Sequence, residues 1–69
     1  MESYYVNKNA QPLSGDNEVH TSKCSFLPKI ENREYFGLFN NCNEAVVQAK
    51  KKGYNANGCY YCCNSCHTK

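Results

Sequence analysis

Two pairs of candidate metal ligands stand far apart in the sequence. The first pair is His20 with Cys24, and the second is Cys59 with Cys62. Each pair can supply two donors from a short stretch of backbone, and joining them through one ion would close a loop of about 35 residues. Imidazole nitrogen and thiolate sulfur are the donors that tetrahedral Zn²⁺ sites use. The spacing therefore predicts a zinc site made by His20, Cys24, Cys59 and Cys62.

The fourth ligand stays open at this point, because two further donors lie close to the second pair. Cys66 or His67 could replace His20 and give a more local site with Cys59 and Cys62. The second pair could instead be a redox dithiol. Two bulky tyrosines separate its thiols, however, and no βαβ pattern precedes it, so we favour metal binding.

The remaining cysteines allow several interpretations. Cys42 fits either a small buried hydrophobic residue or one half of a disulfide with Cys66, which would hold the C-terminal tail against the domain. Cys63 directly follows a ligand, so we expect it to point away as a free thiol. Six cysteines in a short chain are also compatible with three disulfides, as in a secreted peptide.

Size and composition make a stabilising cross-link necessary, either a metal ion or a disulfide. A chain of 69 residues with 41% apolar residues has a core that barely offsets roughly 1.5 kcal/mol of ordering entropy per residue. A structural zinc ion contributes on the order of 10–16 kcal/mol of apparent binding free energy, and a disulfide roughly 2–4 kcal/mol. We therefore expect a single small metal-binding domain over residues 1–69.

Compartment and partners follow from charge and hydropathy. The sequence starts with polar and acidic residues, without the basic and apolar regions of a secretory signal, and has no apolar stretch long enough for a membrane span. These features favour a cytoplasmic protein with reduced thiols. The net charge of +2 is too small to indicate nucleic-acid binding by itself.

Periodicity predicts a small α+β fold. We expect short strands near residues 4–6, 18–21 and 35–39, with Gly37 marking a bulge or a close contact, and one helix over about residues 42–52. Asn41 and Glu44 fit a capping box before this helix, and Gly53 fits its C-terminal end. One helix face is apolar and should cover the sheet, and its members are Cys42, Ala45, Val46 and Ala49. Asn57-Gly58 is expected to form a turn ahead of a cysteine-rich tail.

The motif order resembles a known family. His20-x3-Cys24, an aromatic strand, a helix with Glu44-Ala45, and Gly-Tyr shortly before Cys59-x2-Cys62 resemble the metal-binding domain of the Ada alkylation-response proteins and the small Ada-like zinc modules. The resemblance covers His20 to Cys62, and it implies that the four ligands hold one zinc ion within a small α+β fold. In Ada proteins the first ligand is a cysteine thiolate that irreversibly accepts a methyl group from a DNA phosphotriester. Histidine at position 20 is a neutral ligand and makes methyl acceptance unfavourable.

The sequence therefore favours a structural zinc-binding module, monomeric and non-catalytic, with a protein or nucleic-acid partner and no membrane association. Four protein ligands leave no coordination position open for water, and no acidic residue near the motif is placed as a general base. The alternative from another class is a zinc-thiolate alkyl acceptor or thiol-redox protein that uses Cys62, Cys63 or Cys66. A disulfide-stapled secreted peptide is the second alternative.

Overall fold

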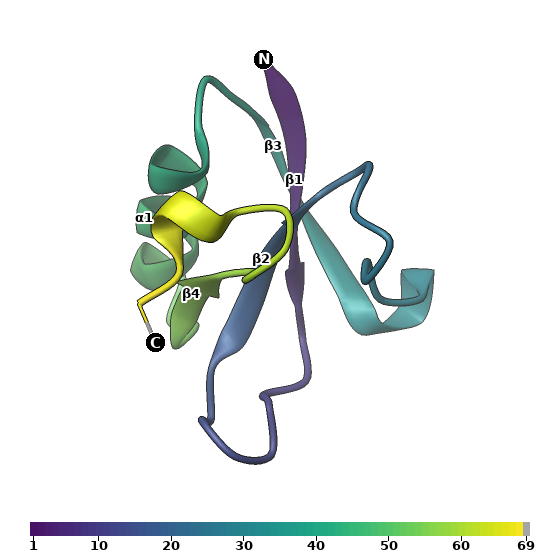
Figure 1. Cartoon of the computed structure of the whole chain (residues 1–69). Helices are drawn as coiled ribbons and strands as arrows, with labels where there is room; N and C mark the ends of the chain where they lie inside the picture. The colour runs from purple at the N-terminus through teal and green to yellow at the C-terminus, as the bar shows by residue number, and fades with distance from the viewer. Residues whose placement is uncertain (69) are drawn as a thin grey trace.

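The computed structural model describes residues 1–68, which form a mixed sheet covered on one face by a single helix (Figure 1). The sheet order is β3-β1-β2-β4. Strand β1 pairs antiparallel with both β2 and β3, whereas β2 and β4 run parallel. The α+β fold expected from the sequence is confirmed. The elements are β1 (Glu2–Asn7), β2 (Asn17–Thr21), β3 (Arg33–Phe39), α1 (Cys42–Lys51) and β4 (Ala56–Gly58), with 3₁₀ turns at Ile30–Asn32 and Asn64–Cys66.

The three predicted strands and the helix are present, with β1 and β3 longer than expected. The prediction of a turn at Asn57-Gly58 is wrong, because both residues belong to β4. Asparagine and glycine are poor strand formers, so pairing with the distant strand β2 decides this segment against its local preference. The Asn57 side chain is 5% exposed, and its amide donates to Asp16 Oδ2 at 2.9 Å, which fixes the start of β2 beside β4.

Both ends of α1 follow the predicted capping. The Asn41 side chain accepts a hydrogen bond from the Glu44 amide at 3.0 Å. The Glu44 carboxylate reaches back to the amide of Asn40 at 3.1 Å, one residue earlier than the standard capping box. After the helix, Gly53 adopts a φ of 107°, a conformation that residues with a Cβ rarely take. Asn41 and Glu44 therefore set the start of the helix at Cys42, and Gly53 sets its end.

The hydrophobic core lies between α1 and one face of the sheet. Side chains from the apolar helix face pack with Tyr4, Val6 and Val19. Successive residues of a strand point to opposite faces, so the neighbours of these residues lie on the other face of the sheet. Tyr5 of β1 and His20 of β2 are paired in register and belong to this second face. The core therefore fixes the strands from one side and leaves the other side for the site.

The predicted bulge at Gly37 is confirmed. Tyr4 pairs with Gly37 and Tyr5 pairs with Tyr35, so β3 has one extra residue in this interval. Gly37 has a φ of 111°, which glycine adopts without strain.

The C-terminal tail crosses in front of α1 and β4 and is drawn in yellow (Figure 1). A disulfide joins Cys66 to Cys42 at the start of the helix. The Thr68 amide donates to the Asn57 side chain at 3.1 Å and secures the tail on β4. Within residues 1–68, α1 is the only α-helix and its ten residues are too few and too polar to cross a bilayer.

Candidate metal centre

Strand pairing brings the two distant ligand pairs together. The parallel register aligns Val19 with Gly58, so the next residues, His20 and Cys59, enter the same region. The Cys59 amide donates to the Val19 carbonyl at 3.0 Å and continues this pairing beyond the strand. Cys24 lies in the turn that follows β2, where its amide donates to the Thr21 carbonyl at 3.2 Å. The site is thus built where β2 and β4 end side by side.

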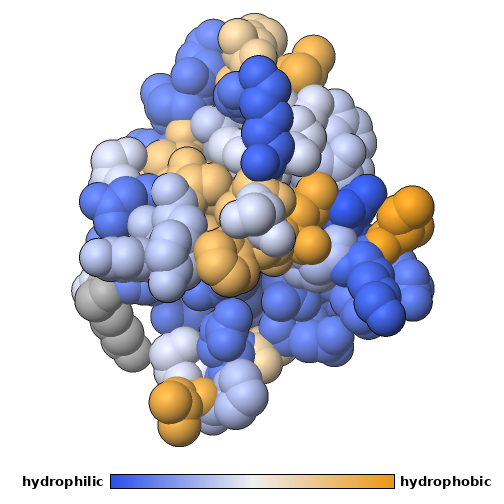
Figure 2. All heavy atoms as spheres, turned by 45° about the vertical axis from the view of Figure 1, so that its right-hand side comes forward, coloured by the Kyte–Doolittle hydropathy of each residue, from blue (hydrophilic) through white to orange (hydrophobic). Residues whose placement is uncertain are grey.

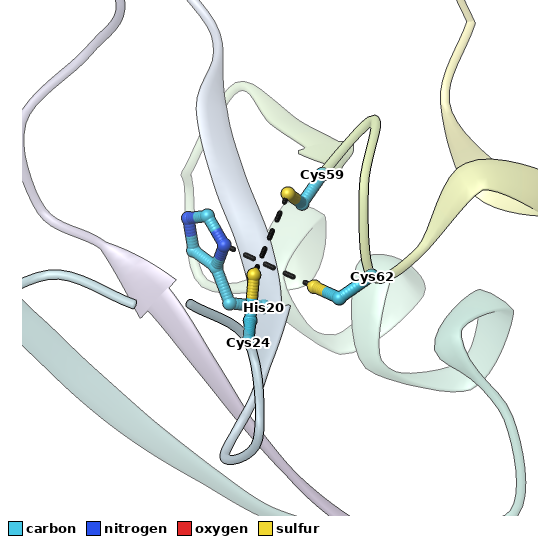
Figure 3. A group of neighbouring side chains, drawn as sticks. All are labelled: His20, Cys24, Cys59 and Cys62. Atoms are coloured by element: carbon cyan, nitrogen blue, oxygen red, sulfur yellow. Dashed lines mark hydrogen bonds between the residues drawn. The ribbon is translucent and has the colours of Figure 1, made fainter. Parts of the chain in front are cut away.

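The four predicted ligands converge on one point (Figure 3). The donor atoms of His20, Cys24, Cys59 and Cys62 all lie within 4.8 Å of one another. Cys24 Sγ and Cys59 Sγ are 3.9 Å apart, and Cys62 Sγ is 3.9 Å from His20 Nδ1. Sulfur donors around a tetrahedral zinc, with Zn–S bonds of about 2.3 Å, lie about 3.8 Å apart. The cluster therefore has the size of a tetrahedral coordination shell and could hold a metal ion.

Burial shapes the protonation of these donors. It raises the pKa of the Cys24 thiol and, despite nearby backbone amides that act in the opposite direction, that of the Cys59 thiol. Burial also lowers the pKa of the His20 imidazole, which favours the neutral form that ligates metals. Thiolates at buried positions need a compensating positive charge. A bound cation would supply that charge, so protons would leave the site as the metal enters.

Backbone amides surround the sulfur atoms and orient them. The Thr21 amide donates to Cys62 Sγ at 3.3 Å, and the Phe26 amide donates to Cys24 Sγ at 3.4 Å. Hydrogen bonds from backbone N–H groups stabilise the charged form of a thiolate. The first bond also connects the end of β2 to the turn after β4, so it aligns the two halves of the cluster.

Glu18 lies on the side of the His20 imidazole that faces away from Cys62. Nδ1 of His20 faces Cys62, and Nε2 lies 3.6 Å from Glu18 Oε1. Metal-ligating histidines commonly present their second nitrogen to a carboxylate, which fixes the tautomer and the ring orientation. Glu18 and His20 share a strand face because they are two residues apart. The two-residue spacing from His20 is the signal by which Glu18 could have been predicted from the sequence, and Glu18 was not among the predicted site residues.

The other candidate ligands lie outside the cluster. Cys66 is held in the disulfide with Cys42. His67 Nδ1 lies 3.0 Å from the Gly58 carbonyl and donates a hydrogen bond to it. His20, whose position as the fourth ligand was left open, is therefore the histidine that the structure brings to Cys24, Cys59 and Cys62.

Cys63 lies in the hydrophobic core and outside the candidate metal cluster, although its sulfur atom is only 3.8 Å from that of Cys62. The Cys63 side chain is a free thiol, 3% exposed, and belongs to the core cluster under α1. Burial, followed by the proximity of Cys62, raises the pKa of Cys63 to about 12. The thiol is therefore protonated at neutral pH and acts as a small apolar side chain.

Within residues 1–68 the structure does not contain the three disulfides that six cysteines could form. Among the described residues one disulfide joins Cys42 and Cys66, and the other four cysteines are free. A disulfide requires sulfur atoms about 2.05 Å apart. The separation of 3.9 Å between the sulfur atoms of Cys24 and Cys59 fits a shared cation instead.

Comparisons of the chain with models of protein families, with curated proteins and with solved structures give no match.

Proposed function

We propose that the protein is a small zinc module in which one Zn²⁺ ion joins β2 and the segment after β4, and that it serves as a binding scaffold and not as an enzyme. The observation that carries this proposal is the convergence of one imidazole and three thiols, from segments 35 residues apart, at tetrahedral separations. Sulfur-rich tetrahedral donor sets of this kind favour zinc among the common divalent ions of cells, with iron as the main competitor.

A structural role follows from the number of donors. Four protein ligands fill a tetrahedral shell, whereas catalytic zinc sites keep one position for water or substrate. Glu18, the acidic residue closest to the cluster by sequence, faces the back of the His20 ring and supports the ligand. A module of this kind acts through its surface, so we propose that it binds a protein or nucleic-acid partner as a monomer.

We propose the cytoplasm as the compartment on the basis of the three cluster thiols, which must stay reduced to bind metal, whereas the Cys42–Cys66 disulfide is a feature of oxidising compartments. The relation to Ada-type modules is likewise a proposal. It is supported by the order of the four ligands along the chain, whereas the neutral imidazole at position 20 argues against a methyl-accepting role.

The decisive experiment combines metal analysis with NMR. Native mass spectrometry of the protein, with the Cys42–Cys66 disulfide intact and the four other cysteines reduced, should show one zinc ion for each molecule, and a strong chelator should collapse the dispersed proton spectrum. Treatment with a DNA methyl phosphotriester should leave the mass of the zinc-bound protein unchanged, because the neutral imidazole at position 20 lowers the negative charge of the donor set and makes its thiolates weaker nucleophiles. A chain that keeps its native spectrum without any bound transition metal would contradict the proposed function.

A further inference from the structure

A cavity of about 270 Å³ lies directly beside the metal centre. Two of the four cluster residues, His20 and Cys59, contribute to its wall. The remaining lining comes from β1, the loop after it, β2 and the segments that carry the cysteines, namely Asn7, Gln11, Glu18, Phe26, Tyr60 and Tyr61. Pockets for small organic ligands usually enclose about 300–1,000 Å³. This cavity is therefore suited to a single side chain.

The charge of the cavity is negative. Among residues 1–68, Glu18 is the only acidic residue in the lining, and no lysine or arginine contributes. The Glu18 side chain is 22% exposed, so its carboxylate remains accessible while it contacts His20. A divalent ion with three thiolates and a neutral imidazole adds a net charge of about −1 behind the wall. A cation is thus the complementary ligand.

The rim of the cavity is aromatic. The rings of Phe26 and Tyr61 are stacked with centroids 4.4 Å apart, and Tyr60 meets Tyr61 edge-on at 5.1 Å. All three side chains are more than half exposed, at 56%, 68% and 55% in the order Phe26, Tyr61 and Tyr60. The face in Figure 2 is mostly hydrophilic, with apolar side chains gathered near its centre and others isolated at its edge. Exposed aromatic faces beside a carboxylate attract organic cations.

We propose that the cavity binds the guanidinium group of an arginine side chain from a protein partner. A guanidinium carries five N–H donors in one plane and stacks on aromatic rings, which an ammonium group cannot do as well. The acceptors available to it are the Glu18 carboxylate and the amide oxygens of Asn7 and Gln11. Asn7 Oδ1 already accepts from the Asn9 amide at 2.9 Å and keeps a second lone pair.

This inference rests on the proposed function, because the metal holds the turn from Cys59 to Cys62 that carries both tyrosines. It narrows the partner to a protein with an exposed arginine. Nucleobases also stack on tyrosine and pair with amides, but the negative charge of the cavity disfavours the phosphates that accompany them.

The test is an NMR titration of the zinc-loaded, ¹⁵N-labelled full chain with N-acetyl-arginine amide. The neutral isostere N-acetyl-citrulline amide is the matched control ligand, and cytidine monophosphate tests nucleotide binding. We expect saturable shifts at the amides of residues 18 and 59–61 with a Kd on the order of millimolar, as for a ligand with few contacts. Citrulline should bind about five-fold more weakly or worse, because it lacks the charge.

Two variants locate the binding. Glu18→Gln should weaken arginine binding about five-fold, whereas Glu31→Gln, at an exposed acid outside the cavity, should leave it unchanged. Tyr61→Leu should weaken it about two- to five-fold through the loss of cation–π contact. Tyr35→Leu is its control, because Tyr35 is 53% exposed but does not line the cavity.

Zinc occupancy is measured on the titrated samples by native mass spectrometry, and the coordination shell of each variant is checked from the visible absorption of a separate Co²⁺-substituted preparation. Equal binding of arginine and citrulline to a metal-loaded protein, or stronger binding of the nucleotide, would overturn the arginine site and leave the zinc module intact. A folded protein that takes up no metal would overturn the proposed function instead. If Glu18→Gln lowers metal occupancy, Tyr61→Leu decides the question, since Tyr61 is no ligand.

Discussion

The adjacent residues Cys62 and Cys63 allow a sharp test of the metal centre. Replacing Cys62 by alanine should remove one of four donors, whereas replacing Cys63 by alanine should leave the donor set complete. Cys62 Sγ lies 3.9 Å from His20 Nδ1 and belongs to the cluster. Cys63 is 3% exposed and packs in the core. The two substitutions delete the same atom from neighbouring positions, so only their location differs.

The two substitutions are expected to affect metal affinity and folding stability to very different extents. If a structural zinc ion contributes about 10–16 kcal/mol and four ligands share this equally, loss of Cys62 removes about 2.5–4 kcal/mol, or about 10²–10³-fold in metal affinity. Loss of the Cys63 sulfur leaves a small void in the core and should lower the free energy of unfolding by about 1 kcal/mol. For a chain of this length that corresponds to a decrease in Tm of about 4–8 °C.

Two measurements separate these effects. Zinc affinity is determined by competition with a chromophoric chelator, and the coordination shell is followed through the thiolate-to-metal absorption of the Co²⁺-substituted protein. Cys62→Ala should lose affinity and sulfur-to-metal intensity, while Cys63→Ala should retain both and show only the lower Tm. Equal metal affinity of the two variants, or a larger loss for Cys63→Ala, would refute the assignment of the ligands.

Four further predictions concern the metal cluster, the disulfide and the packing at Gly58. Metal affinity should fall steeply as pH decreases from 8 to 6, because protons compete for thiols such as Cys59 whose pKa is raised; chelator competition across this range measures it. In the metal-free protein, the lowered pKa of His20 should make stability decrease as pH falls below about 6.5, where the unfolded chain gains a proton that the folded chain excludes; urea unfolding at several pH values checks this sign. Reducing the Cys42–Cys66 disulfide, which spans a sequence separation of 24, should lower the free energy of unfolding by about 3.5 kcal/mol without releasing the metal, as thermal unfolding and metal analysis of the double alanine variant would show. Gly58→Ala should destabilise the protein by more than a typical surface substitution, since its Cβ would lie 2.7 Å from the Cys66 Cβ, and Tm measurement against the unsubstituted protein tests this.

The elements that local signals specify were predicted from the sequence. The helix has its cap at Asn41, its end at Gly53 and an apolar face at helical spacing, and all three appear in the structure. The four residues of the metal cluster were named from the spacing of two pairs, and they lie together.

The parts that depend on distant contacts were not predicted. Strand β4 is three residues long, too short to show a period, and it exists because it pairs with β2. The cavity beside the cluster is assembled from segments that no local pattern connects, and Glu18 gains its role only where β2 meets the metal site. These features arise from long-range packing, which composition and periodicity do not encode.

The side chains of the adjacent residues Cys62 and Cys63 lie in different surroundings. Cys62 belongs to the candidate metal cluster, and Cys63 belongs to the hydrophobic core with residues of α1. For Cys63 to replace Cys62 as a ligand, its thiol, now 3% exposed, would have to leave the core. Under the proposed function, this vicinal pair offers the ion one sulfur, because the other belongs to the hydrophobic core.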